Sequence, residues 1–369
     1  MLWGRAAGRC EKCNISVSWH PQTKTDANLA EAAHIIGFSE NGPRPEKDLP
    51  DELVNDISNL MLLCRLCHGP IVDAKEDEYT VEFLRQMKRS HEEWVERVIE
   101  IHRDRESHIL LYGANVGDHS PILSYRGTAP ALIADNRCPA SRTPISLGMS
   151  NSSCRDRTGD FWCFESRHLR NMITQHVYPR LHPGDVEHLS IFAVAPQPLL
   201  VLLGYLLCDI NYEAQVYQLH REPPDWIWQD HPEGPEYIIE RPNGAAGKPA
   251  LVLALSAPVK DDRIFEKLGN DAAIWRITVP QPDRDFLKSS KQLERYRTLI
   301  RPLLDEIKDM YDRGTVLNVF PAAPVSVCVE LGRSIQAKAH MPLHLWDENK
   351  DLGGFVHALD INFAQGGAS

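Results

Sequence analysis

The spacing of apolar residues predicts two kinds of structure, before and after about residue 106. Between Tyr79 and Arg105, apolar residues recur at steps of three and four among charged residues, which indicates one long amphipathic helix. We expect the apolar stripe of this helix to pack on its own domain, or the helix to form a linking arm or part of a dimer seam. After this helix, short apolar runs alternate with helical patterns. Such alternation is typical of parallel sheets of the α/β class.

The expected elements of the second part follow from this alternation. Residues 114–159 are rich in Gly, Pro, Ser and Asn and show little periodicity, so we expect a long surface loop there. A shorter loop is expected over residues 39–58, and a short helix over residues 2–9. Strands are expected over residues 108–113, 188–195, 214–219, 250–255, 274–279, 315–320 and 342–346, and helices over residues 161–181, 198–207, 288–313 and 325–337.

One strand–helix unit occurs twice in the sequence. The segment LSIFAVAP at residues 189–196 matches LNVFPAAP at residues 317–324, and the agreement continues to Gly204 and Gly332. Each copy has the pattern of a strand, a tight Ala-Pro turn and a helix. Proline fits the start of a helix because that amide has no helical partner.

This repeat predicts two related lobes in the second part of the chain. We expect them over about residues 106–245 and 246–369. An amino-terminal domain of residues 1–105 would precede them, which suits a chain too long for one small core.

Composition describes an ordinary globular protein whose charge disfavours constitutive nucleic-acid binding. The 369 residues are 43% hydrophobic and 25% charged, and the net charge is −11. Residues 1–105 hold 14 basic and 19 acidic residues, whereas a general nucleic-acid binder normally carries a basic face. One copy should therefore bind DNA weakly, which indicates that assembly or activation precedes DNA binding.

The sequence predicts a cytoplasmic protein with no membrane segment. No run of about 18 uninterrupted apolar residues occurs, and the first residues lack a basic-then-apolar secretion leader. Five of the nine cysteines lie outside the motif described next, and we expect them to be reduced thiols. These five are Cys138, Cys154, Cys163, Cys208 and Cys328.

The first hundred residues contain the spacing of a structural zinc site. Cys10 and Cys13 form one Cys-x-x-Cys pair, and Cys64 and Cys67 form a second pair about fifty residues later. Two such pairs are the usual ligand set of a tetrahedral structural Zn²⁺. Four thiolates leave no open position on the metal, so this zinc would fasten the fold and perform no chemistry.

Three polar residues occur in order around this motif, namely His34, Asn59 and His68. The arrangement resembles the HNH nuclease family over roughly residues 1–105. The resemblance implies an α+β, zinc-stapled ββα-metal domain that hydrolyses double-stranded DNA. In that family pattern His34 is the general base and Asn59 holds local geometry. His68 ligates a divalent ion, Mg²⁺ or Mn²⁺, that polarises the scissile phosphate.

One position departs from the HNH pattern. Many HNH enzymes place an acidic metal ligand just before the first histidine, where this chain has Ala33. Glu31 or another carboxylate would then have to complete the metal site. The Cys64-to-His68 tail leaves open a zinc module that binds nucleic acid without cutting it. Ala33 leaves open a ligand-sensing signalling or adaptor protein with a weakened, mainly structural HNH unit.

The second part resembles the SAVED family, whose duplicated CARF-like, Rossmann-like lobes sense cyclic oligonucleotides. The likeness rests on residues 188–201, 216–228 and 318–327 and spans roughly residues 107–369. An HNH unit fused to a SAVED unit looks like an effector of CBASS anti-phage immunity. The resemblance implies that a cyclic di- or oligonucleotide binds the SAVED lobes, promotes homo-oligomers and switches on DNA cleavage.

Candidate ligand contacts lie at the turns and on the aromatic residues of the two lobes. Ligands of open α/β sheets bind beyond the carboxyl ends of the strands, where helix amino termini present free amides. Aromatic faces hold nucleobases. A Gly-x-Gly-x-x-Gly turn and a Gly-rich Lys-Ser/Thr loop are both missing, which disfavours a metabolic nucleotide-binding enzyme. The expected contacts are Gln197, Pro198, Pro324 and Ser326 at the turns, Trp226, Trp228, Phe320 and Trp346 as stacking rings, with Tyr217 behind them, and Arg333 as a phosphate partner, with Arg221 and Lys338 as further cations.

Overall fold

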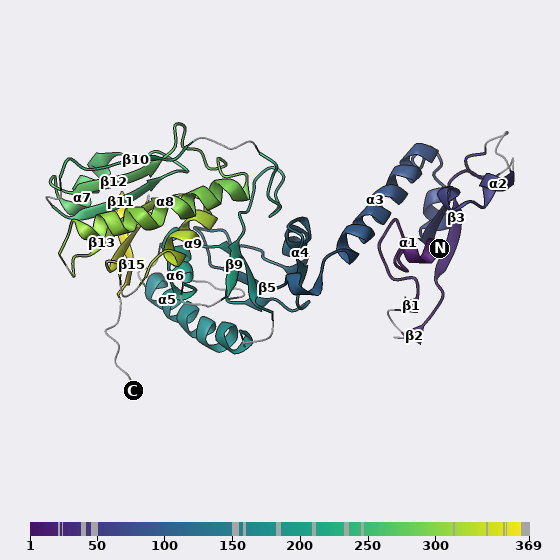
Figure 1. Cartoon of the computed structure of the whole chain (residues 1–369), viewed down its shortest axis with the longest axis horizontal. Helices are drawn as coiled ribbons and strands as arrows, with labels where there is room; N and C mark the ends of the chain where they lie inside the picture. The colour runs from purple at the N-terminus through teal and green to yellow at the C-terminus, as the bar shows by residue number, and fades with distance from the viewer. Residues whose placement is uncertain are drawn as a thin grey trace. The chain divides into compact units, whose positions relative to one another are not determined.

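The chain forms two compact units, Met1–His102 and Arg103–Ser369, each with its own hydrophobic core (Figure 1). Within the part of the chain that is described, no helix is both long and apolar enough to cross a membrane. The computed structural model describes residues 1–20, 23, 25–37, 42–45, 51–149, 155–157, 160–181, 186–208, 212–231, 236–244, 247–312, 314–336, 339–349, 351 and 353–362. Cys154 and Lys338 lie outside these residues.

The first unit is built on a β-hairpin followed by a helical segment. Strands β3 (Ala30–His34) and β4 (Leu60–Cys64) are antiparallel, and His34 lies opposite Leu60. The apolar run of β4 is buried almost throughout, because this strand forms the centre of the small core. The π-helical segment η2 (His68–Asp73) follows at once. This order confirms the α+β fold expected for the amino-terminal domain.

A long helix closes the first unit. Helix α3 begins after Thr80, whose side chain caps it by accepting a hydrogen bond from the Phe83 amide. Leu84 and Val95 are buried, so part of the apolar stripe packs on its own domain, whereas Trp94 is 39% exposed. The elements of this unit besides the hairpin and η2 are α1 (Leu2–Arg5), β1 (Trp19–His20), β2 (Thr25–Asp26), α2 (Asp51–Val54), η1 (Ile57–Asn59) and α3 (Val81–Ile99).

The second unit contains two sheets, which confirms the α/β class. Every strand pair of the first sheet is parallel, in the order β6-β5-β8-β9, and β7 also pairs with β5. The second sheet has the order β10-β12-β11-β13-β14-β15, and only its two edge strands are antiparallel to their neighbours. The strands are β5 (Glu106–Gly113), β6 (Cys138–Pro139), β7 (Ile145–Ser146), β8 (His188–Val194), β9 (Glu213–Val216), β10 (Ile238–Glu240), β11 (Pro249–Ala254), β12 (Ala273–Thr278), β13 (Leu317–Ala322), β14 (Leu343–Asn349) and β15 (Gly354–Ile361).

Some elements of the second unit differ from the expectation. The loop expected over residues 114–159 contains helix α4, which Ser124 caps and whose interior Pro130 hides the helical pattern. Strand β10 precedes the expected lobe boundary at residue 245 yet pairs with β12, so the second sheet begins earlier. Helix α7 and strand β15 were not expected. The helices are α4 (Tyr125–Ala134), α5 (Phe161–Met172), η4 (Ile173–Val177), η5 (Tyr178–Arg180), α6 (Gln197–Leu206), α7 (Asp261–Leu268), α8 (Ser290–Asp309) and α9 (Val325–Arg333), with η3 (Arg103–Arg105) before β5.

The two repeated strand–helix units meet where α6 crosses α9. A Cβ atom added at Gly204 would lie 2.0 Å from the carbonyl oxygen of Val329, and one added at Gly332 would lie 2.0 Å from that of Val201. These are the same contact with the two copies exchanged. The crossing therefore has approximate twofold symmetry, and both backbones approach too closely for any side chain larger than that of glycine.

Candidate functional site

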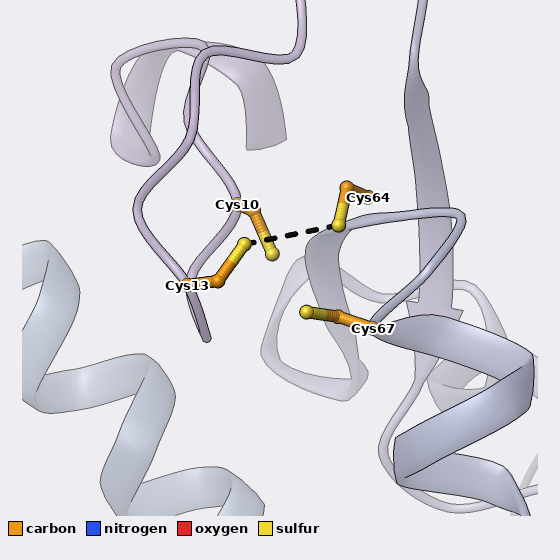
Figure 2. A group of neighbouring side chains, drawn as sticks. All are labelled: Cys10, Cys13, Cys64 and Cys67. Carbon is orange, nitrogen blue, oxygen red and sulfur yellow. Dashed lines mark hydrogen bonds between the residues drawn. The ribbon is translucent and has the colours of Figure 1, made fainter.

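The four motif cysteines form one cluster in the first unit. Figure 2 shows their side chains directed toward one another, and all four sulfur atoms lie within 4.8 Å of one another. The sulfurs of Cys13 and Cys64 are 3.8 Å apart. Zinc–sulfur bonds of about 2.3 Å in a tetrahedron separate the sulfurs by about 3.8 Å. The donor set and its spacing therefore fit a structural Zn²⁺.

Backbone amides around the cluster favour thiolate at one ligand. Burial acts to raise the pKa of the Cys10 thiol, but hydrogen bonds from the backbone of Cys13, Cys64 and Lys12 outweigh it and lower this pKa. Burial raises the pKa of Cys67, whose sulfur lies among the other three. A bound cation would reverse this effect, because a metal-coordinated thiol loses its proton.

Asn59 joins the chain after β3 to the segment before β4. Its side-chain oxygen accepts a hydrogen bond from the Ile36 amide at 2.9 Å, and its nitrogen donates to the carbonyls of Ile36 and Val54 at 3.2 and 3.0 Å. The side chain is buried, and these contacts are all to backbone atoms. Asn59 therefore holds the geometry of the segment that follows His34.

The two histidines of the motif contact different partners. The His34 Nε2 atom lies 3.2 Å from the Asn55 Oδ1 atom. The His68 Nδ1 atom lies 2.8 Å from a Glu31 oxygen, and its Nε2 atom lies 3.1 Å from Asp73 Oδ2. His68 is thus bracketed by two carboxylates. Imidazole and carboxylate donors suit Mn²⁺, and carboxylates suit Mg²⁺, so this group fits a divalent ion.

Glu31 occupies the face of β3 that the family's acidic ligand would use. Side chains alternate along a strand, so Glu31 projects to the same face as Ala33, whereas His34 projects to the other. A carboxylate therefore lies two residues before Ala33, on the same face of β3 and in contact with His68. The sequence named Glu31 only as one option, since the pairing with His68 depends on the hairpin register.

A buried arginine connects the two histidine environments. Arg44 donates to the carbonyls of Ile35 and Val72 at 2.9 and 3.2 Å, and to an Asp73 carboxylate oxygen at 2.8 Å. It also reaches the His34 carbonyl at 3.4 Å. Sequence reasoning missed Arg44 and Asp73. Arg44 lies in a Gly/Pro-rich stretch without periodicity. The only signal for Asp73 in the sequence is that it follows His68 by five residues, a spacing that the single segment η2 spans.

The structure brings the two strand–helix turns of the second unit together. The side-chain amide of Gln197 donates to the Ala323 carbonyl at 2.9 Å, so the turn after β8 touches the turn after β13. Ser326 is fully buried and donates to the Gln218 side chain at 2.8 Å. Pro198 and Pro324 are also buried. These residues fix the turns against each other, and in this structure Ser326 has its hydroxyl engaged inside the protein.

The expected stacking rings are mostly packed in the protein. Phe320 is fully buried between Trp346, stacked at 5.3 Å between ring centroids, and Phe355, edge-on at 5.0 Å. Trp226 is 5% exposed and packs edge-on against Phe192 at 5.1 Å. Phe320 and Trp226 therefore have core positions here, with no ring face free for a base. Apolar runs in buried strands give this ambiguity, since stacking and core aromatics look alike in sequence.

Two other expected residues line a cavity of about 480 Å³. Trp228 and Arg333 lie in its wall, beside Arg137 and Arg297. Buried Glu330 contacts Arg333 at 2.8 Å and Arg297 at 3.5 Å, so part of this positive charge is balanced. Sequence reasoning missed Arg137 and Arg297, which come from separate elements.

A second cavity, of about 400 Å³, lies at the carboxyl ends of β5 and β7. Its wall includes Gly113, Asn115, Ser146, Gly148 and Glu165. Burial raises the pKa of Glu165. This is the end of a parallel sheet where ligands bind, but none of the ligand contacts expected from the sequence lines this cavity.

Comparison with known proteins agrees with both halves of this description. Residues 13–69 match the HNH endonuclease family, and residues 169–361 match the family of sensor domains described as "SMODS-associated and fused to various effectors" (SAVED). No curated protein matches the sequence.

Similar solved structures include the Cap4 SAVED/CARF-domain containing receptors. That of Acinetobacter baumannii with the cyclic trinucleotide 2'3'3'-cAAA has a TM-score of 0.43 and 11% identity, covering 78% of this chain and 55% of that one. That of Moraxella osloensis has a TM-score of 0.43 and 12% identity, covering 80% of this chain and 64% of that one. The chain thus spans less than two thirds of these receptors. Because the sensor match extends over more than half of its length, the chain belongs to the SAVED family, with an HNH endonuclease segment fused ahead of the sensor.

Proposed function

We propose that this protein is a cyclic-nucleotide-activated, metal-dependent DNA endonuclease that acts as an anti-phage CBASS effector. Its nuclease domain would be residues 1–105 and its SAVED sensor residues 106–369. One observation carries the proposal. The chain joins a zinc-knuckle HNH segment, in which His68 is bracketed by Glu31 and Asp73, to a SAVED sensor.

In the proposed reaction His34 acts as the general base that takes a proton from the attacking water. Histidine is the side chain that most often acts as a general base, because a neutral ring nitrogen can accept that proton. Asn59 keeps the backbone after His34 in place through its three hydrogen bonds. Held by His68 with Glu31 or Asp73, a Mg²⁺ or Mn²⁺ ion would supply positive charge to the phosphate oxygens.

Activation would proceed through assembly. The nuclease segment is acidic, so a single copy should hold DNA weakly. A cyclic di- or oligonucleotide bound by the SAVED part would favour an oligomer in which several nuclease domains grip double-stranded DNA together. For this to work, the ligand must bind the assembled state more tightly than the free chain. Trp228 and Arg333, which share one cavity wall, are our first candidates for its contacts.

Plasmid degradation with Mg²⁺ and a panel of synthetic cyclic di- and trinucleotides tests the activity. We expect one member of the panel to switch on cleavage, and His34→Ala to abolish it while His102→Ala, an exposed histidine of the same unit, does not. Undiminished cleavage by His34→Ala would remove His34 from the mechanism. Sizing the protein with and without the activating ligand tests assembly, which is refuted if cleavage rises while the oligomer stays unchanged.

Ala33 favours one alternative, a ligand-sensing signalling or adaptor protein whose HNH unit is mainly structural. Metal-dependent nicking of plasmid DNA separates the two functions. The adaptor predicts ligand binding and a change of assembly with no nicking under any metal. The nuclease predicts that nicking depends on Mg²⁺ or Mn²⁺ and is lost in His68→Ala.

A further inference from the structure

Three potential metal donors meet on the last two strands of the second unit, far along the chain from the cysteine cluster. His344 lies on β14, and His357 and Asp360 lie on β15. The His344 Nδ1 atom is 2.8 Å from Asp360 Oδ1, and the His357 Nε2 atom is 3.1 Å from the same oxygen. The three donor atoms all lie within 4.8 Å of one another. Nothing in the nuclease or sensor assignments uses these residues.

A β-bulge creates this convergence. Side chains three apart on a regular strand point to opposite faces, so His357 and Asp360 would normally be separated by the sheet. The register between β14 and β15 shifts between Leu345 and Trp346, with His344 opposite Asp360 and Trp346 opposite His357. Residues paired across two strands lie on the same face, so the shift brings both histidines and the aspartate together. Bulges commonly re-aim a side chain in this way.

Aromatic rings surround the two imidazoles. The ring centroids of His344 and His357 are 3.9 Å apart with the planes 22° from parallel. The Trp346 ring lies 5.2 Å from His344 and 6.3 Å from His357, and it is itself fixed by a 3.1 Å hydrogen bond from its Nε1 atom to Asn318. A metal ion binds imidazole nitrogen in the plane of the ring, so one of the two stacked rings must turn about its χ2 angle when both bind the same ion.

The donor set, spacing and exposure suit an open metal site. Two imidazole nitrogens and one carboxylate oxygen are a common three-ligand set for Zn²⁺, with a fourth position left to water. Bonds of about 2.1 Å place tetrahedral ligands about 3.4 Å apart, so the two nitrogen–oxygen hydrogen bonds of 2.8 and 3.1 Å would open by about 0.3–0.6 Å when an ion replaces them. The side chains of His344, His357 and Asp360 are 30%, 42% and 41% exposed, so an ion can enter from solvent.

We propose that His344, His357 and Asp360 form a second metal site, which takes a divalent transition ion such as Zn²⁺ and fastens the edge strand β15 to β14. The site is independent of the nuclease proposal, because it lies entirely within the second unit.

Zinc titration of the full-length chain tests the site. The titration uses the His68→Ala variant, which lacks the nuclease histidine. The protein retains one Zn²⁺ per chain in the cysteine cluster. Calorimetry should then detect one further equivalent of Zn²⁺. Cobalt should occupy the same position, with only the weak visible bands of nitrogen and oxygen ligands and no added thiolate charge-transfer absorption.

Matched variants assign the further equivalent to these residues. His357→Gln and Asp360→Asn should each weaken it more than tenfold and abolish the rise in melting temperature that Zn²⁺ gives the parent. Asp305→Asn is the control, since it breaks another histidine–carboxylate pair, with His340 at 3.2 Å, and should leave zinc binding unchanged. The proposal is overturned if no further equivalent binds, which would leave a hydrogen-bonded triad only, or if either variant binds it as tightly as the parent.

Discussion

Replacing Gly204 by alanine should force apart the crossing of α6 and α9. The added methyl would lie 2.0 Å from the Val329 carbonyl oxygen and 2.8 Å from the Arg333 amide nitrogen. Carbon–oxygen contacts in proteins essentially never fall below 3.0 Å, so the two helices must separate by about 1 Å. The obstacles are backbone atoms of the partner helix, which cannot rotate away as a side chain would.

The expected loss of stability follows from two opposing effects. Overpacking a core costs about 1–3 kcal/mol and occasionally more, and the backbone clash here favours a gross cost of about 3–4 kcal/mol. Alanine gains about 1 kcal/mol over glycine within a helix. The net loss should therefore be about 2–3 kcal/mol. For a unit of this size that lowers the melting temperature by roughly 5–10 °C.

Differential scanning calorimetry of the full chain measures this effect. Gly332→Ala should lower the melting temperature of the second unit by a similar amount, because its methyl meets Val201 in the same way. The double variant should lose less than the sum, since helices already separated by one methyl accommodate the other. Gly127→Ala is the control, as its methyl would be 3.4 Å from Ser124 Oγ, an ordinary contact. Equal melting of Gly204→Ala and wild type would refute the reasoning.

Two further predictions concern a buried arginine and a partly buried aspartate. Arg44→Lys should destabilise the first unit by about 2–4 kcal/mol in a thermal melt, because a lysine ammonium cannot donate to the carbonyls and to Asp73 at the same time. Arg85→Lys, at an exposed position on α3, is the control, and equal melting temperatures of the two variants would contradict this role of Arg44. Burial, together with the nearby charge of Asp156, raises the pKa of Asp347 to about 7. The folded chain therefore binds this proton more tightly than the unfolded chain does, and the free energy of unfolding falls as the pH rises from about 4 to 7. The free energy of unfolding of Asp347→Asn should then equal that of wild type at pH 4 and exceed it at pH 8 by up to about 4 kcal/mol. If the two proteins differ by the same amount at both pH values, Asp347 does not titrate in this way.

The sequence was most informative where chemistry depends on local spacing. Two Cys-x-x-Cys pairs predict a four-sulfur cluster, because each pair needs only a tight turn to bring its thiols together. The structure confirms that cluster. The alternation of strands and helices indicated the α/β class for a similar reason, since periodicity is a local property. The likeness of residues 189–196 to residues 317–324 further predicted that the α/β part contains two related lobes.

The details of the sites depended on contacts between distant residues. Glu31 and Asp73 come to His68 only through the register of β3 with β4 and the turn of η2, and Arg44 reaches them from a stretch without periodicity. Phe320 has the sequence pattern of a stacking residue, yet the neighbouring rings enclose it.

By itself, then, the sequence determined the zinc motif, the order of the HNH residues, the family of the sensor and the alternation of its elements. Only the tertiary structure decided which carboxylates meet His68, that glycine is obligatory at both sides of the α6–α9 crossing, and that one extra residue in β15 aims His357 and Asp360 at His344. The physical reason is that local patterns fix backbone conformation and burial. Strand register, bulges and helix crossings are set by packing between segments far apart in the chain, so they cannot be predicted from a short stretch of sequence.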